Sequence, residues 1–161
     1  NPVVFLENEI LYGKSFDVPE ISDHTVPFGK ARIWREGSDV TIVSFGIGMT
    51  YALEAADALA SDGIMAEVIA LRTLRPMDTE AVVRSVQKTN RCITVEEGWP
   101  VASIGSYVSS VIMQEAFDYL DAPVITCCGK DVPMPYAANL EKLALVTTKE
   151  VVAAAKSVCY R

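Results

Sequence analysis

Apolar residues along the chain form short continuous runs, separated by stretches in which they recur every three or four positions. The continuous runs lie at 40–45, 66–71, 92–95 and 123–128. Runs of this kind are typical of strands buried on both faces, as in parallel sheets. The stretches between them have the spacing of amphipathic helices. The pattern therefore predicts alternating strands and helices, with helices covering both faces of a mainly parallel sheet.

Polar residues at the borders of these stretches indicate where the helices begin. Thr50 can cap the first helix, and Asp78 or the residue after it begins the second. The third helix is predicted within 104–117. Thr147 and Glu150 have the spacing of a capping box ahead of a fourth helix.

The chain ahead of the first core strand has an alternating pattern instead. Residues 31–34 alternate between apolar and polar positions, and residues 36–39 supply turn chemistry before the strand at 40–45. This arrangement predicts a β-hairpin whose first strand runs antiparallel to the rest. The expected fold is a three-layer α/β/α domain with a mixed, mostly parallel five-stranded sheet.

A segment rich in turn residues separates the opening of the chain from this domain. Residues 12–28 carry glycine, proline and scattered acids, and the apolar run at 3–6 has the character of a strand already under way. We therefore divide the chain into 1–28, the end of a preceding domain with a linker, and 29–161, the α/β domain. A strand so close to the first residue indicates the back part of a longer polypeptide.

Composition narrows the range of partners. The 161 residues are 50% hydrophobic and 22% charged, with a formal net charge of −7. An acidic balance without a lysine or arginine cluster argues against nucleic-acid binding, because the phosphates would be repelled. No apolar run approaches the roughly 20 residues of a transmembrane helix. We therefore expect neither nucleic acid nor membrane as a partner.

The cysteine pattern favours free thiols. Adjacent strand residues point to opposite faces, so Cys127 and Cys128 cannot bind one metal ion together, and no Cys-x-x-Cys spacing occurs. Cys92 and Cys159 stand alone in the sequence. Buried thiols in a reducing compartment are the simplest interpretation.

Charged residues follow two of the predicted strands, where α/β sheets bind ligands. Glu96 and Glu97 have no histidine, cysteine or lysine nearby in sequence, so we favour contact with a neighbouring domain or subunit over acid–base catalysis. Arg72 and Arg75 could bind an anion, although interdomain ion pairing is the simpler interpretation. Trp99 is either an interface anchor or a rim contact on the domain's own core.

Several motifs together give the chain a family resemblance. They are Asn1–Gly13, Leu71–Asp78, Val95–Pro100, Leu120–Pro123 and Asp131–Leu140. In this order and spacing they resemble the C-terminal half of pyruvate dehydrogenase E1 β subunits, over essentially the whole chain. Branched-chain 2-oxo acid dehydrogenase β subunits share the fold, but residues 74–78 and 132–136 are similar to the pyruvate version.

The resemblance implies a transketolase-type C-terminal domain after a pyrimidine-binding domain, whose end would be residues 1–28. It implies an α2β2 enzyme, made with an E1 α subunit and a second β subunit, that uses thiamine diphosphate and magnesium. That enzyme decarboxylates pyruvate and reductively acetylates the lipoyl group of E2. The family's catalytic and cofactor-binding β residues lie in the earlier domain, and His24 matches none of them. The resemblance also implies the mitochondrial matrix or, in a bacterium, the cytoplasm.

Two family roles carry over to positions of this sequence. Asn1 matches the last residue of a loop that binds a structural potassium ion, and Asp121 matches an acid that contacts the E2 subunit-binding domain. Arg161 would lie near that contact. We therefore expect a part that serves subunit assembly and E2 docking and has no decarboxylase activity alone. The alternative from another class is a stand-alone α/β module that binds a small anion through Arg72 and Arg75.

Overall fold

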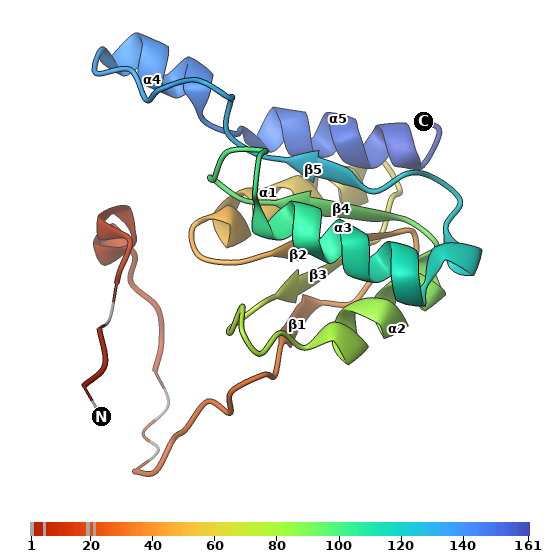
Figure 1. The fold of residues 1–161 in the computed structure, drawn as a ribbon, viewed down its shortest axis with the longest axis horizontal. Coiled ribbons are helices and arrows are strands. Elements are labelled where there is room, and N and C mark those ends of the chain that lie inside the picture. Colours follow the sequence, from red (N-terminus) through yellow and green to blue (C-terminus); the bar gives the residue numbers. More distant parts are fainter. Residues whose placement is uncertain (1, 5, 19, 21) are drawn as a thin grey trace.

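The computed structural model describes residues 2–4, 6–18, 20 and 22–161. They form a mixed five-stranded sheet with helices on both faces (Figure 1). The strands are β1 (Arg32–Arg35), β2 (Val40–Ser44), β3 (Ala66–Ala70), β4 (Cys92–Val95) and β5 (Ile125–Cys127). The helices are α1 (Gly48–Ser61), α2 (Thr79–Thr89), α3 (Ile104–Glu115), α4 (Ala138–Ala144) and α5 (Thr148–Val158). Two short 3-10 turns lie at Glu9–Gly13 and Phe117–Tyr119.

The sheet order is β1-β3-β2-β4-β5. β2, β3, β4 and β5 are parallel, and β1 runs antiparallel to its neighbour β3, with Ile33 opposite Ile69. The predicted fold class and the antiparallel first strand are therefore confirmed.

The predicted hairpin between the first two strands is wrong. Both edges of β2 are taken by parallel partners, β3 and β4, so β1 pairs with the free edge of β3 instead. The turn at 36–39 crosses the start of β3, where the amides of Ser38 and Asp39 donate to the carbonyl of Met65 at 3.0 and 2.9 Å. A Cβ on Gly37 would lie 2.2 Å from the backbone of Ala66, so only glycine fits this crossing.

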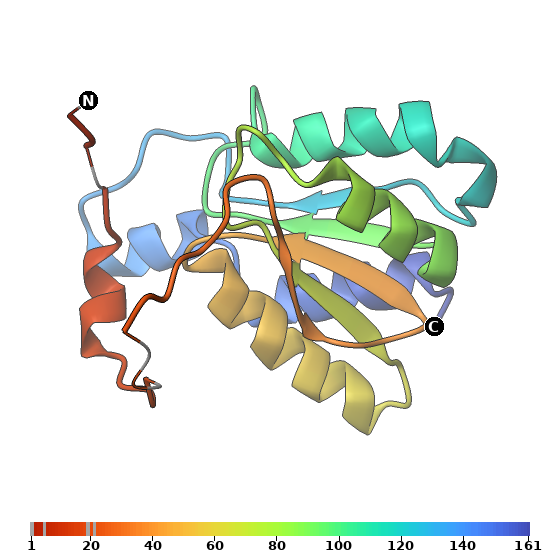
Figure 2. The ribbon, with the colours of Figure 1, turned by 90° about the horizontal axis from the view of Figure 1, so that it is seen from below.

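Helices cover the sheet in two layers. α1 and α5 pack on one face and α2 and α3 on the other, as seen from below in Figure 2. Each layer has its own core of buried aliphatic side chains. Ile42, Leu59 and Val151 belong to the α1/α5 side, and Ile69 and Ile112 to the α2/α3 side.

Two of the three helix caps that the sequence predicts are confirmed. Thr147 and Glu150 form the predicted capping box of α5, and Asp78 caps α2 by accepting from the amide of Ala81 at 3.2 Å. The prediction that Thr50 caps α1 is wrong, because the helix begins two residues earlier, at Gly48. The short helix α4 was not predicted.

The carboxylate of Asp78 also ties the entering chain to the domain. Its second oxygen accepts from the amide of Ala31 at 2.9 Å, and Asp78 is 8% exposed. Close by, the amide of Gly29 donates to the hydroxyl of Thr73 at 2.7 Å. The segment that enters the domain is therefore fixed to the β3–α2 loop at two points.

The predicted opening strand at 3–6 is not found in the described part of that run. Val3, Val4 and Leu6 are exposed and belong to no strand, and residue 5 lies outside the described residues. A strand needs a hydrogen-bonding neighbour, and all pairing in the described sheet involves β1 to β5. Among the described residues, no helix has both the length and the apolar character to cross a bilayer.

Candidate functional site

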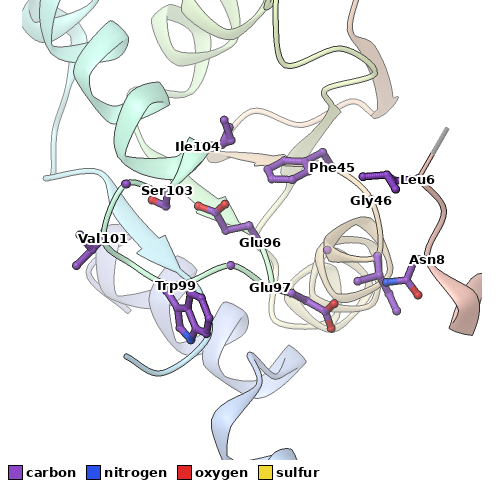
Figure 3. Close-up of a pocket in the computed structure, with 14 residues that line it drawn as sticks. Leu6, Asn8, Phe45, Gly46, Glu96, Glu97, Trp99, Val101, Ser103 and Ile104 are labelled. Carbon is purple, nitrogen blue, oxygen red and sulfur yellow. The ribbon is translucent and has the colours of Figure 1, made fainter. Parts of the chain in front are cut away.

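The carboxyl ends of the parallel strands border an open surface hollow of the domain. β3 and β4 lie on opposite sides of β2, so the loops that follow them diverge and leave a crevice at this edge. An open cavity of about 560 Å³ occupies it, lined by residues 45–48, 96–99 and 101–104 together with Leu6 and Asn8. Figure 3 shows Glu96, Glu97 and Trp99 on the loop that follows β4.

Glu96 is a buried carboxylate held at the start of a helix. Its side chain is 4% exposed, and one oxygen accepts from the amide of Gly105 at 2.8 Å, in the first turn of α3. The partial positive charge at a helix N-terminus stabilises a carboxylate there. A Cβ on Gly105 would lie 2.9 Å from the same oxygen, so glycine permits this contact. Glu96 therefore has a fixed position beneath the cavity.

Glu97 points away from Glu96, toward α1 (Figure 3). The hydroxyl of Tyr51 in α1 donates to its carboxylate at 3.1 Å. Burial, together with the negative charge of Glu97, raises the pKa of Tyr51. Tyr51 thus stays protonated and serves as a hydrogen-bond donor. The neighbouring acids are held by different helices and do not form one catalytic pair.

Trp99 joins this edge to the proline-rich loop. Its indole nitrogen donates to the carbonyl of Val132 at 3.0 Å, which fixes the ring, and the side chain remains 53% exposed. Val132 precedes two prolines that stiffen the backbone here. Trp99 is therefore a half-exposed aromatic side chain, held in place at the rim of the cavity.

Arg72 and Arg75 lie on the β3–α2 loop, at the same edge of the sheet as the acids. Both side chains are exposed. Within the part of the chain that the structure describes, neither takes part in an ion pair. The structure thus brings both sequence-predicted charged pairs and Trp99 to one edge.

Asp121 lies at the opposite edge, ahead of β5. Its carboxylate accepts from the guanidinium of Arg91 at 2.8 Å and is 52% exposed. The hydroxyl of Tyr160 donates to the backbone carbonyl of Asp121 at 2.7 Å, and Arg161, the next residue, is exposed. In Figure 1 the C-terminus accordingly lies at the end of the sheet away from α4. Asn1 lies outside the described residues.

The two buried thiols, Cys92 and Cys127, are poorly suited to act as nucleophiles. Burial raises the pKa of Cys92 to about 12, and burial together with the neighbouring Cys128 raises the pKa of Cys127 to about 12. All the cysteines are free, as the sequence predicts. In the described residues, no three histidine, cysteine or acidic side chains are grouped to hold a metal ion.

Two structural features were not predicted from the sequence: a buried ion pair and the helix α4. Glu67 is 1% exposed in the middle of β3 and pairs with Lys88 of α2. The signal for it was present, since an acid interrupts an apolar strand. The second feature is α4, which presents Leu140 and Leu143 to solvent. Their spacing of three residues is one helical signal in that stretch, which also consists mainly of the helix formers Ala, Leu, Glu and Lys.

Comparison with known proteins matches the chain to one family of domains and to several named subunits. The family model "Transketolase, C-terminal domain" matches residues 29–151. The chain is 63% identical over 161 residues to the pyruvate dehydrogenase E1 component subunit beta of Rhizobium meliloti (strain 1021), covering 100% of this chain and 35% of that protein. It is 53% identical over 164 residues to the mitochondrial subunit beta of Dictyostelium discoideum, covering 100% of this chain and 46% of that protein.

Among solved structures, the chain is similar to a split-gene transketolase described as an inactive beta4 tetramer. The two share 34% sequence identity with a TM-score of 0.75, over 89% of this chain and 46% of that chain. This likeness confirms the fold. The chain spans half or less of the length of the relatives named above.

Proposed function

The chain belongs to the transketolase C-terminal domain family, and from this premise we propose that it forms the C-terminal part of a pyruvate dehydrogenase E1 β subunit. The observation that carries the proposal is the 63% identity to such a subunit over the whole chain. The intact enzyme would pair β with an E1 α subunit as α2β2. It would decarboxylate pyruvate and pass the acetyl group to the lipoyl group of E2.

The residues described here do not fit thiamine diphosphate. The cavity at the carboxyl edge is lined by the carboxylates of Glu96 and Glu97, which would repel a diphosphate. The start of α3 already binds the carboxylate of Glu96 and is not free for an anion. We therefore propose that thiamine diphosphate and magnesium are bound by other parts of the enzyme. The same geometry leaves the alternative anion-binding module Arg72 and Arg75, but without the start of α3.

The role of this domain would then be assembly and docking. We propose E2 docking at the amino edge, where Asp121 is half exposed and Tyr160, the residue before Arg161, donates to its backbone carbonyl. The net charge of −7 suits a basic partner surface. Arg91 already offsets part of the charge of Asp121, so a basic group of E2 would compete with it or share the carboxylate. The compartment would be the mitochondrial matrix or the bacterial cytoplasm, since relatives come from both kinds of organism.

A substrate assay tests the overall assignment. The full-length β polypeptide, combined with its α subunit, thiamine diphosphate and magnesium, is expected to decarboxylate pyruvate in preference to branched-chain 2-oxo acids. The 161-residue chain alone is expected to show no turnover. Preference for a branched-chain substrate would contradict the pyruvate assignment, and turnover by the isolated chain would contradict the assembly role.

A second experiment tests the docking site. In the intact enzyme, Asp121→Asn removes the charge but keeps the size, and Asp118→Asn is a matched control on an exposed acid three residues away. We expect the first variant to weaken binding of the E2 subunit-binding domain about tenfold, equivalent to about 1.4 kcal/mol. Turnover with an artificial electron acceptor should stay unchanged. Equal E2 affinity for wild type and Asp121→Asn would refute the assignment.

A further inference from the structure

A second, much smaller cavity lies between β4 and the start of α3. Its volume is about 10 Å³, which is about the least room that one water molecule needs. Aliphatic side chains, among them Val43, Leu71 and Val108, form much of its wall, and Thr94 and Glu96 are its two polar side chains. A cavity with an apolar wall alone stays dry, whereas two polar groups can hold a water molecule.

Thr94 brings a buried hydroxyl to this small cavity. The residue is 2% exposed, and its Oγ1 has no hydrogen-bond partner among the described residues. Burying a hydroxyl without a hydrogen bond is costly, and native proteins rarely do so. The hydroxyl can donate one hydrogen bond and accept two. Thr94 therefore calls for a small polar partner in the cavity that it lines.

Glu96 brings an acceptor with spare capacity to the same place. Its side chain is directed toward the start of α3 (Figure 3), where Oε1 accepts from the amide of Gly105 at 2.8 Å. A carboxylate can accept about four hydrogen bonds, and this is the one that the described residues supply to Glu96. At 4% exposure, bulk solvent reaches it poorly. A further donor inside the protein would therefore stabilise this carboxylate.

Gly105 shows how closely the two oxygens approach one another. A Cβ at this position would lie 2.5 Å from Oγ1 of Thr94 and 2.9 Å from Oε1 of Glu96. Because both distances are measured from one point, the two oxygens are no further apart than two hydrogen bonds laid end to end. A single water molecule spans such a separation with hydrogen bonds of about 2.8 Å. A side chain at position 105 would take up part of this space.

We propose that this small cavity is the binding site of one internal water molecule, which links the hydroxyl of Thr94 to the carboxylate of Glu96. The water donates one hydrogen to the carboxylate, which can only accept, and exchanges its other hydrogen bond with the Thr94 hydroxyl. The bridge satisfies a buried hydroxyl and fixes Glu96 from a second side. It acts inside the domain and is independent of the function proposed above.

A crystal structure of the full-length protein, at a resolution that shows ordered waters, tests the site directly. We expect one density peak within hydrogen-bond distance of both Oγ1 of Thr94 and a carboxylate oxygen of Glu96. If the region holds no peak, or if the Thr94 hydroxyl binds a protein atom instead, the water site is wrong. A peak surrounded by six oxygen atoms would mark a metal ion and would equally overturn the assignment.

The Thr94→Val variant tests the bridge by the sign of its effect on stability. Valine keeps the shape of threonine but removes the hydroxyl, so the water would lose one of its two side-chain partners. We expect the density peak to disappear and the midpoint of thermal unfolding to fall by about 3 °C. A hydroxyl that truly has no partner would give the opposite result, because its removal relieves a cost. An unchanged or higher midpoint would therefore overturn the bridge.

Two control variants separate the bridge from general packing effects. Thr94→Ser keeps the hydroxyl and should keep the water, which decides the question even if Thr94→Val does not fold. Thr126→Val makes the same replacement on β5, at the residue paired with Thr94, which does not line the small cavity. It should leave the water in place. Loss of the water from Thr94→Ser, or equally from both valine variants, would show that the hydroxyl of Thr94 does not hold it.

Discussion

The buried ion pair between Glu67 and Lys88 gives the most exacting prediction for this fold. Glu67 lies inside β3 with 1% of its side chain exposed, whereas the side chain of Lys88 is 44% exposed. Lys88 also reaches Glu36 at 3.1 Å. Burial alone would raise the pKa of Glu67, but hydrogen bonds from Lys88 and Ser85 outweigh it and hold the pKa below its usual range. The carboxylate is therefore charged in the folded domain and depends on Lys88.

The Lys88→Met variant removes the counter-charge and leaves Glu67 buried. Breaking a fully buried pair costs about 3–5 kcal/mol, but water reaches Lys88, so we expect a loss of about 2 kcal/mol in the free energy of unfolding. Glu67→Gln should cost about 1 kcal/mol, because the freed ammonium group can turn to solvent. The double variant should cost less than the sum of the single losses, by about 1 kcal/mol.

The pH dependence reverses sign between wild type and Lys88→Met. In wild type the folded pKa of Glu67 is lowered from 4.5, so its contribution is complete above that value and is lost as pH falls through the folded pKa. Without Lys88, burial raises the folded pKa above 4.5. The variant then gains relative stability at low pH and loses it as pH rises. The deficit of Lys88→Met against wild type should thus be smaller at pH 5 than at pH 8.

Urea unfolding followed by far-UV circular dichroism at pH 5 and pH 8 measures these differences. Arg84→Met is the matched control, since it removes the exposed partner of Glu80 on the same helix and should change stability by no more than about 0.5 kcal/mol. Strict additivity of the two single variants, or a Lys88→Met deficit independent of pH, would refute the reasoning.

Two further predictions concern packing and thiol chemistry. Gly105→Ala should lower stability by about 1–3 kcal/mol, because its Cβ would lie 2.5 Å from the Thr94 hydroxyl and 2.7 Å from a methyl of Thr126. Gly98→Ala is the control, because its Cβ would come no closer than 3.4 Å to another residue. In thermal unfolding it should shift the midpoint far less than Gly105→Ala does. Equal shifts of the two variants would count against this account. Cys92 is fully buried, and this burial raises its pKa to about 12. Iodoacetamide at pH 8 should therefore label Cys92 only after denaturant is added. Rapid labelling of Cys92 in the native protein would contradict the burial.

Sequence patterns predicted the core strands and the main helices because their information is local. A continuous apolar run shows burial on both faces, and a capping box marks a helix start whatever lies elsewhere. The partner of β1 could not be read in this way. It depends on the amides of Ser38 and Asp39 meeting Met65, which is distant in sequence. The helix α4 was missed because it has seven residues and no side-chain cap.

The candidate site shows the same limit. The sequence placed Glu96, Glu97 and Arg72 after strand ends, and strand topology alone brings them to one edge. What the sequence could not show is which donor each acid meets. Glu96 contacts Gly105 only because α3 docks above β4, and Asp121 contacts Arg91 only because β5 lies beside β4. Such partners follow from tertiary packing, which periodicity does not encode.

The anchoring of the entering segment has a mechanical consequence. The amide of Ala31 donates to Asp78, and the amide of Gly29 donates to Thr73. Thr73 lies within the loop that carries Arg72 and Arg75, and Asp78 lies at the end of that loop. A pull or twist applied upstream of Gly29 therefore acts on that loop directly, without passing through the sheet. Reorientation of whatever precedes this domain would shift the two arginines, whereas Asp121, braced by Arg91 at the far end, would keep its place.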